Sequence, residues 1–357
     1  MSLPKSYKAY AFTEKSGQLK PVTVDWHDPV DGEIVVKVLA CGVCARYSPL
    51  FTAGRVKALN TMFLLGSDDI VKEQFLPTGL PRIPGHEIVG DVVAVPPTEK
   101  VWKVGQRVGS GWHGGHCSTC SRCRSGDYVT CEKQQVNGVF TDGGFAEYVT
   151  LRTEAVASVP EELDPAEAAP LFCAGVTTFN SLRHMSALPP DVVAVQGIGG
   201  LGHLAIQMAH AMGYRVIALS SSDSKRQLAL ELGAHEYIDG SKVNQTEALL
   251  QRGGAKLIIC TAPNPPVIES LVPALAVNGE LLSLAIVPSA NVPLALMVSK
   301  RLSIRGWPSG TAKDSQDCLE FAVTNGIKCM VEKFPLDKAQ EAYDRRGSAR
   351  FRAVIVP

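Results

Sequence analysis

Four cysteines crowd into one short segment and form the clearest chemical signature of the chain. They are separated by two, two and seven residues: Cys117, Cys120, Cys123 and Cys131. Four thiolates at this spacing, on a loop rich in Gly and Ser, fit a closed tetrahedral zinc site that leaves no position for a substrate. We therefore expect the loop (117–131) to hold a structural zinc, with a disulfide framework or an iron–sulfur cluster as alternatives. His116 adjoins this loop, but four thiolates already fill the coordination sphere, so it is expected to be a bystander.

Three further residues lie far apart in the sequence and are also metal-ligand types. Cys44 follows Gly42-Val43, His86 lies in a Gly-His-Glu triplet, and Cys173 precedes Ala174-Gly175. Two thiolates and one neutral imidazole would balance the charge of Zn²⁺ and leave its fourth position open, which is the pattern of a catalytic site. For each residue alone, packing in a core is the alternative.

A glycine-rich turn follows the apolar run 192–195 and precedes a stretch with helical periodicity. Its residues are Gly197, Ile198, Gly199, Gly200, Leu201 and Gly202. The first glycine permits a tight turn, the second admits a pyrophosphate to the backbone, and the last lets the helix pack against the strand. The helix N-terminus offers free N–H groups to the phosphates. The sequence predicts a dinucleotide site here, with a plain structural turn as the alternative.

The residues after the next apolar run bear on the choice of dinucleotide. An acidic residue at the end of the second strand would bind the ribose 2′-hydroxyl and repel a 2′-phosphate. This chain instead has a run of serines that includes Ser220 and Ser221, followed by Lys225. These hydroxyls and this cation favour NADP(H) over NAD(H), although Asp223 could still reach the ribose. A serine-rich helix N-cap is compatible with either cofactor.

Two different sequence patterns indicate the elements that position these residues. Up to about residue 155 the chain reads as short strands split by turns, such as 33–38 and 88–95, which predicts a mostly β, partly open barrel. From about residue 190 apolar strands alternate with helical stretches, which predicts a doubly wound parallel sheet of α/β type. The strands are expected at 192–195, 216–219, 257–260 and 281–285, with a surface helix at 338–343 and a last strand at 352–356.

Bulk properties narrow the class of protein. The 357 residues favour two domains, and the 35 basic residues equal the 35 acidic ones. Without net charge or a basic block, nucleic acid is not an expected partner. No signal peptide and no apolar run long enough to span a membrane are expected, and thiol-based metal sites favour a reducing compartment, so we expect a cytoplasmic protein.

Taken together, these motifs resemble the zinc-containing medium-chain dehydrogenase/reductase family, especially its alcohol dehydrogenases. The resemblance spans nearly the whole chain, from the Gly-His-Glu triplet and the cysteine loop to the glycine turn and the ending Ala349-Arg350-Phe351-Arg352. It implies a GroES-like catalytic domain (1–160), a Rossmann domain (161–300) and a return to the first domain (301–357). It also implies a small-molecule alcohol or aldehyde as substrate and a homo-oligomer, either dimer or tetramer.

The same resemblance assigns roles to individual residues. It implies one catalytic zinc held by Cys44, His86 and Cys173, with Glu87 beside it as an occasional ligand. It places Thr177 near the nicotinamide and Arg352 near the cofactor phosphates. It places substrate-pocket residues at Trp112 and His113, where ordinary packing is an equal alternative. Cys41, three residues before Cys44, is expected to pack rather than to compete for metal.

The pattern departs from the family after Cys44. Relatives continue with a residue, then Ser or Thr, then Asp, but here Ala45-Arg46-Tyr47 follows. Omitting residues 45–65 would join Cys44 to Gly66-Ser67-Asp68 and place Ser67 nineteen residues before His86, as the family does. We therefore interpret 45–65 as an insertion, with Ser67 as proton relay and Asp68 as the carboxylate that orients the zinc-bound imidazole. A retained intron or an error in the gene sequence is the alternative.

The expected function is reversible hydride transfer between an alcohol and NADP(H) or NAD(H), yielding an aldehyde or ketone. A second hypothesis is a catalytically impaired member of the family that binds dinucleotide but forms no catalytic zinc site because of the insertion. A zinc-free reductase of the same superfamily is a third, which Cys44, His86 and Cys173 disfavour.

Overall fold

The computed structural model describes residues 3–44, 71–72, 79–287 and 289–357 and divides into two compact units. The first contains the described residues up to 176 together with 309–357, and the second contains those from 177 to 308. The interpreted insertion (45–65), Ser67 and Asp68 lie outside the described residues. Each unit is described by itself.

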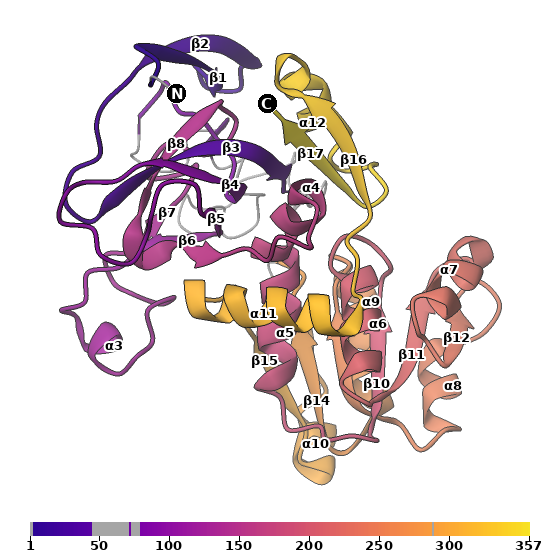
Figure 1. Ribbon diagram of the computed structural model, residues 1–357. Helices are drawn as coiled ribbons and strands as arrows, with labels where there is room; N and C mark the ends of the chain where they lie inside the picture. Colours follow the sequence, from indigo (N-terminus) through magenta and orange to yellow (C-terminus); the bar gives the residue numbers. More distant parts are fainter. Residues whose placement is uncertain (1–2, 45–70, 73–78, 288) are drawn as a thin grey trace. The chain divides into compact units, whose positions relative to one another are not determined.

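The first unit is built on a seven-stranded sheet in the order β16-β17-β3-β4-β5-β9, with β8 also paired to β3 (Figure 1). The strands are β3 (Glu33–Val43), β4 (Glu87–Ala94), β5 (Arg107–Ser110), β8 (Tyr148–Arg152), β9 (Ala157–Ser158), β16 (Val331–Pro335) and β17 (Arg352–Val356). Neighbours are antiparallel except β16 and β17. Two further pairs are β1 (Ser6–Phe12) with β2 (Leu19–Asp25), and β6 (His113–Gly115) with β7 (Gln135–Val136).

The core of this unit is apolar and includes the fully buried Phe12, Ile34, Ile88 and Phe145. The strands expected at 33–38 and 88–95 and the last strand at 352–356 are confirmed as β3, β4 and β17. Short helical elements complete the unit: α3 (Ser121–Arg124), η3 (Thr153–Ala155), α4 (Pro165–Ala168), η4 (Ala169–Phe172), η7 (Leu336–Lys338) and α12 (Ala339–Arg345).

The longest helix in the described part of the first unit, α11 (Ala312–Asn325), was not anticipated from the sequence. It begins with a capping box, in which the Thr311 hydroxyl accepts from the Asp314 N–H and the Asp314 carboxylate accepts from the Thr311 N–H. It ends at Gly326, whose φ of 64° is left-handed. The Thr-x-x-Asp pattern and this glycine are the local signals that could have located the helix.

The second unit is a six-stranded parallel sheet in the order β12-β11-β10-β13-β14-β15 (Figure 1). The strands are β10 (Val192–Gln196), β11 (Arg215–Ser220), β12 (Glu236–Asp239), β13 (Ala255–Cys260), β14 (Leu275–Ser283) and β15 (Ser303–Gly306). The chain winds outward in both directions from β10, so the strand order reverses between β10 and β13. In such sheets the ligand crevice lies beyond the carboxyl ends of the strands at this reversal.

Helices connect the strands, as the alternation in the sequence predicts. They are α5 (Ala174–Arg183), which crosses the division between the units, α6 (Gly202–Ala211), η5 (Asp223–Lys225), α7 (Arg226–Glu231), α8 (Gln245–Leu250), α9 (Pro265–Leu271), η6 (Val272–Ala274) and α10 (Leu294–Lys300). The four expected strands are confirmed as β10, β11, β13 and β14. Two more, β12 and β15, were missed because each has only four residues and is interrupted by polar ones.

The boundaries between the units fall later than the expected 160/161 and 300/301. The structure divides the chain after Val176 and after Pro308. The first shift arises because α4 and η4 pack on β3 and β4, and the second because β15 joins the parallel sheet.

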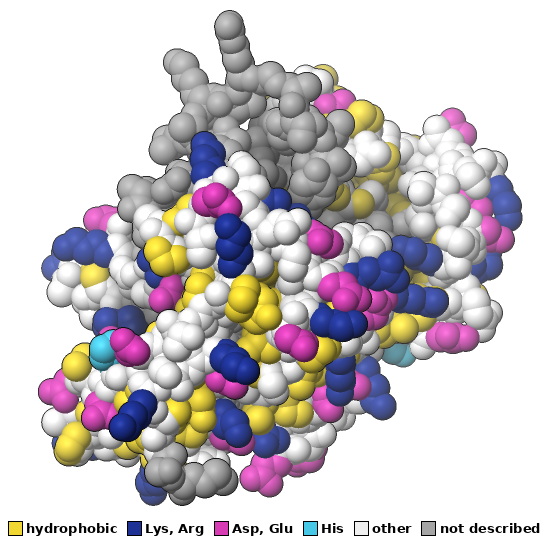
Figure 2. Space-filling model, turned by 90° about the horizontal axis from the view of Figure 1, so that it is seen from above, with side chains coloured by type: hydrophobic (Ala, Val, Ile, Leu, Met, Phe, Trp, Pro, Cys, Tyr) yellow, Lys and Arg dark blue, Asp and Glu magenta, His cyan; other side chains and the backbone are white. Residues whose placement is uncertain are grey.

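The surface carries no dominant charge on the face in Figure 2, where basic and acidic side chains are interspersed, as the equal totals of each predict. Among the described residues, no helix combines the length and apolarity needed to cross a membrane.

Candidate metal centres and cofactor site

The four-cysteine loop forms a compact cluster of sulfur atoms in the first unit. Sγ–Sγ distances are 4.0 Å for Cys117–Cys123, 3.9 Å for Cys120–Cys131 and 3.5 Å for Cys117–Cys131. Tetrahedral zinc with Zn–S bonds of about 2.3 Å places its sulfur ligands about 3.8 Å apart, so the cluster has the dimensions of a zinc site. His116 is outside this set of four thiols and instead stacks on Tyr128, with ring centroids 4.2 Å apart.

Backbone N–H groups of the loop point at the sulfur atoms. The backbone nitrogen of Cys120 lies 3.4 Å from Cys117 Sγ, and that of Cys123 lies 3.5 Å from Cys120 Sγ. The backbone nitrogen of Lys133 lies 3.3 Å from Cys131 Sγ. Hydrogen bonds from Thr119 lower the pKa of Cys117 to about 5, whereas burial raises that of Cys123 to about 12. Four adjacent thiols cannot all ionise without a cation, so the donor set fits Zn²⁺.

A second cluster brings together the three ligand-type residues that lie far apart in the sequence. Cys173 Sγ is 3.9 Å from Cys44 Sγ and 3.3 Å from His86 Nε2. Ligands of one tetrahedral zinc lie at about these separations. These atoms, with a carboxylate oxygen of Glu87, all lie within 4.8 Å of one another.

The sheet of the first unit explains why this cluster forms. β3 and β4 are antiparallel and pair Gly42 with Glu87. Cys44, just after β3, and His86, just before β4, therefore emerge at the same end of the strand pair. Element η4 packs on both strands, and Cys173 directly follows its last residue. Two adjacent strand ends and the end of η4 thus bring the three ligand-type residues together.

Cys44 and His86 are buried, Cys173 is partly exposed, and the groups nearby favour the thiolate form of Cys44. Cys44 and His86 are only 4% and 1% exposed. The hydrogen bond from Cys173 and the nearby His86 and Arg352 hold the pKa of the Cys44 thiol well below its usual range. A thiolate is the form that binds zinc, so this environment favours a metal ligand over a packed thiol.

Glu87 and Arg352 form a buried pair beside this cluster that the sequence did not reveal. Both are nearly inaccessible, and Arg352 Nη2 lies 3.4 Å from Glu87 Oε1. Neither Glu87 oxygen has a hydrogen bond of good geometry within the described part of the chain, and burial raises the pKa of its carboxyl to about 7. A buried carboxylate with one long ion pair and no such hydrogen bond fits a place next to a further cation. β17 brings Arg352 here by pairing with β3.

Trp112 packs against His86. Its ring meets that of His86 edge to face, with centroids 5.3 Å apart. His113 is buried, and its Nε2 lies 3.2 Å from His116 Nδ1. Trp112 is therefore positioned to shape the space around His86, whereas His113 contacts the histidine before the cysteine loop. Cys41 is fully buried in the apolar core and stands outside the second cluster.

The glycine turn in the second unit has the geometry that its sequence predicts. Gly197 has a φ of 87°, which favours glycine, and a Cβ on Gly202 would lie 1.9 Å from the Gly197 carbonyl oxygen. Gly200 and Leu201 lead into α6, with Leu201 at the N-cap. The Thr261 hydroxyl, just beyond β13, lies 2.8 and 3.0 Å from the carbonyl oxygens of Gln196 and Gly197. The sequence around the turn did not indicate this contact, because Thr261 lies far from the turn along the chain.

The glycines of the turn give a paired prediction. A Cβ on Gly199 meets nothing within 4 Å, so Gly199→Ala should fold normally and weaken dinucleotide binding on the order of tenfold by blocking the pyrophosphate. The Cβ of Gly202→Ala would clash with the Gly197 carbonyl oxygen, so the helix must shift from the turn, and this should cost about 1–3 kcal/mol of stability. Thermal unfolding and fluorescence titration with NADPH measure both effects. A Gly199→Ala variant that binds NADPH normally would contradict the assignment of the turn.

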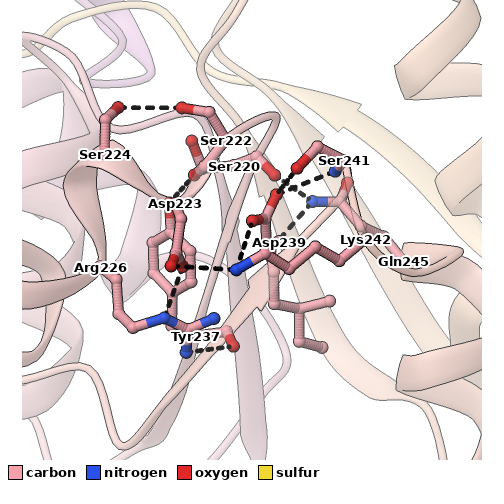
Figure 3. A network of polar contacts seen from close by, with 11 residues as sticks. Ser220, Ser222, Asp223, Ser224, Arg226, Tyr237, Asp239, Ser241, Lys242 and Gln245 are labelled. Atoms are coloured by element: carbon pink, nitrogen blue, oxygen red, sulfur yellow. Dashed lines mark hydrogen bonds and ion pairs between the residues drawn. The ribbon is translucent and has the colours of Figure 1, made fainter.

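The residues expected to determine which cofactor binds lie at and after the end of β11. Ser220 and Ser221 begin a loop in which Asp223 forms ion pairs with Arg226 and Lys242 (Figure 3). Lys225 Nζ donates to the Ile198 carbonyl oxygen at 2.6 Å, so its ammonium lies over the glycine turn. Thr177, the other expected cofactor contact, is buried in α5.

Comparisons with known proteins agree with these features. Residues 30–161 match the family description "Alcohol dehydrogenase GroES-like domain", and residues 200–324 match "Zinc-binding dehydrogenase". Alcohol dehydrogenase patD of Penicillium expansum is 46% identical, with 99% of this chain and 98% of that protein covered. Aldehyde reductase AdhA of Synechocystis is 33% identical, with 98% of both covered. The solved structure of a cinnamyl alcohol dehydrogenase from Sorghum bicolor is similar with a TM-score of 0.79 at 27% identity, covering 99% of this chain and 98% of that one.

Proposed function

Because this chain belongs to the zinc-binding alcohol dehydrogenase family, and so is an enzyme of alcohol and aldehyde oxidoreduction with a nicotinamide cofactor, we propose how its own residues divide that work. Cys44, His86 and Cys173 hold a catalytic zinc, and the loop cysteines hold a structural one. NADP(H) is preferred over NAD(H). The observation that supports this most is the convergence of the first three residues within one unit.

The ligand set determines what the site does to a substrate. Zinc bound there supplies Lewis-acid polarisation of the substrate oxygen, and the nicotinamide donates or accepts hydride. Cys44, His86 and Cys173 leave one position of a tetrahedron free for that oxygen. The burial of Cys44 and His86 limits the access of bulk water, and Trp112 orients the ring of His86 through its edge-to-face contact. Ser67 as proton relay, Asp68 as orienter and Thr177 beside the nicotinamide remain proposals.

Metal analysis combined with a substrate panel tests this function. We expect two zinc ions per chain and reduction of aldehydes by NADPH, measured as loss of absorbance at the nicotinamide band. The panel should contain aliphatic, aromatic and cinnamyl aldehydes, because relatives are named for aldehyde and cinnamyl alcohol chemistry. One zinc per chain without turnover would support the catalytically impaired alternative.

The cofactor preference gives a separate prediction. We expect Lys225→Ala to raise the KM for NADPH about tenfold, because a charge-assisted hydrogen bond to a phosphate contributes about 1.5–3 kcal/mol. The KM for NADH should change little, since NADH lacks the 2′-phosphate, and it serves as the internal control. Steady-state kinetics with both cofactors measures the two values. An equal rise in both would mean that Lys225 serves the glycine turn through Ile198 instead.

A further inference from the structure

The carboxyl ends of β11 and β12 are joined by a network of charges (Figure 3). The carboxylate of Asp223 is bound on both sides, since Arg226 Nε lies 2.6 Å from Oδ1 and Lys242 Nζ lies 3.0 Å from Oδ2. Lys242 Nζ also lies 3.7 Å from Oδ2 of Asp239, the last residue of β12. Lys242 therefore bridges two carboxylates, one in η5 after β11 and one at the end of β12.

The other members of the network are themselves held in place. Asp239 is 3% exposed, and its Oδ1 accepts from the N–H and the hydroxyl of Ser241 at 2.9 and 2.7 Å. Its strand position is fixed because it pairs with Ser220 in the parallel ladder. The guanidinium of Arg226 lies over the ring of Tyr237, 4.7 Å from the ring centroid. The network is thus preformed around Asp223.

Asp223 is the acidic residue of the serine-rich loop, and its carboxylate could disfavour the binding of NADP(H). A free carboxylate here would repel a 2′-phosphate and could bind a ribose 2′-hydroxyl. Within the network, two carboxylates, Asp223 and Asp239, face two cations, Arg226 and Lys242, so their formal charges cancel. The ammonium of Lys225, which donates to the Ile198 carbonyl oxygen, lies outside this balanced set of four charges. Removing Lys242 alone would leave the network with a net negative charge.

We propose that Lys242 is a specificity-determining residue for the cofactor, which acts by neutralising Asp223 and holding it away from the ribose. It does so from the segment between β12 and α8, outside the glycine turn and the serine-rich loop. This inference rests on the proposed binding of a dinucleotide at the glycine turn. It assigns Lys242 an indirect role, through Asp223, and no contact with the cofactor.

The first experiment measures the dissociation constants of NADPH and NADH for the zinc-loaded full-length protein by fluorescence titration. We expect Lys242→Gln to lower the ratio of the NADH constant to the NADPH constant about fivefold, as an exposed ion pair of up to about 1 kcal/mol predicts. NADH should bind more tightly, because the freed carboxylate can accept from the 2′-hydroxyl. An unchanged ratio would overturn the inference.

Lys256→Gln is the matched control. Lys256 lies at the opposite, amino-terminal end of β13, where its Nζ donates to the Asn278 carbonyl oxygen. The same loss of charge in the same unit should leave the ratio within about twofold of wild type. Lys242 is 59% exposed, so its replacement should not affect folding, and thermal unfolding of both variants checks this.

A double-mutant cycle separates the indirect role from a direct contact. In an Asp223→Asn background, Lys242→Gln should shift the ratio less than twofold, because its target charge is gone. The same fivefold loss in that background would mean that the ammonium contacts the 2′-phosphate itself, and the inference would be wrong. Failure of wild type to bind either dinucleotide would instead refute the proposed function, which distinguishes the two failures.

Discussion

Replacing Cys44 by Ser is expected to lower the zinc content from two ions to one per chain and the rate of aldehyde reduction about a thousandfold. Serine keeps the shape of cysteine but is a far weaker zinc ligand, because its hydroxyl does not ionise near neutral pH. Loss of Lewis-acid polarisation costs several kcal/mol of transition-state stabilisation, which corresponds to about three orders of magnitude in rate. Plasma emission spectroscopy and steady-state kinetics with NADPH measure the two effects.

Cys41→Ser is the matched control for this variant. Cys41 lies on β3, three residues before Cys44, is also buried, and its Sγ contacts the Gly42 carbonyl oxygen. It should keep both zinc ions and most of the activity. If the two serine variants behave alike, the loss reflects a damaged core. If Cys44→Ser keeps two zinc ions and full activity, Cys44 is no ligand and the proposed site is wrong.

Residues of metal-ligand type could be recognised in the sequence, but the contacts that bring them together could not. In the cysteine loop, short spacings alone force the sulfur atoms together. Cys44, His86 and Cys173 meet only because of the register between β3 and β4 and the packing of η4 on both, which are tertiary features. The resemblance to a family supplied this grouping in advance, and the geometry now gives a physical reason for it.

What the sequence missed depends on contacts between distant segments. Nothing local indicates that Arg352, at the start of β17, lies beside Glu87, because only the pairing of β17 with β3 brings them together. The Arg352 guanidinium was expected near the cofactor phosphates, and the structure shows it in contact with Glu87 and close enough to Cys44 to lower the pKa of its thiol. Edge strand β15 was missed because its alternation of half-exposed and exposed residues gives no apolar run.

The choice of cofactor illustrates the same limit at a single residue. From the sequence, Asp223 was an argument against NADP(H), because the serine-rich loop could present its carboxylate to the ribose. In the structure both oxygens are engaged by Arg226 and Lys242. Lys242 lies beyond the next strand, so no pattern within the loop could predict that the charge of Asp223 is compensated.

The second large effect is expected at the four-cysteine loop, where Cys131→Ser should remove the structural zinc and destabilise the first unit. The regular structure of the loop is short and includes the four-residue α3. A bound zinc would therefore provide much of the order of the loop. Structural zinc contributes several kcal/mol to folding, and its loss should lower the Tm by about 10 °C. Differential scanning calorimetry measures the shift, and metal analysis should find one zinc per chain.

Limited proteolysis shows whether the destabilisation starts in the loop itself. Arg122 and Arg124 are exposed on α3, so trypsin should cleave after them much faster in Cys131→Ser than in wild type. Ser121→Ala, an exposed change on the same short helix that leaves all four thiols in place, should keep both the Tm and the resistance to trypsin. Because the two metal clusters share no ligand, the zinc that Cys131→Ser retains should be the one at Cys44, His86 and Cys173. A Cys131→Ser protein that keeps its Tm and resists trypsin would mean that the cysteine loop is ordered without zinc.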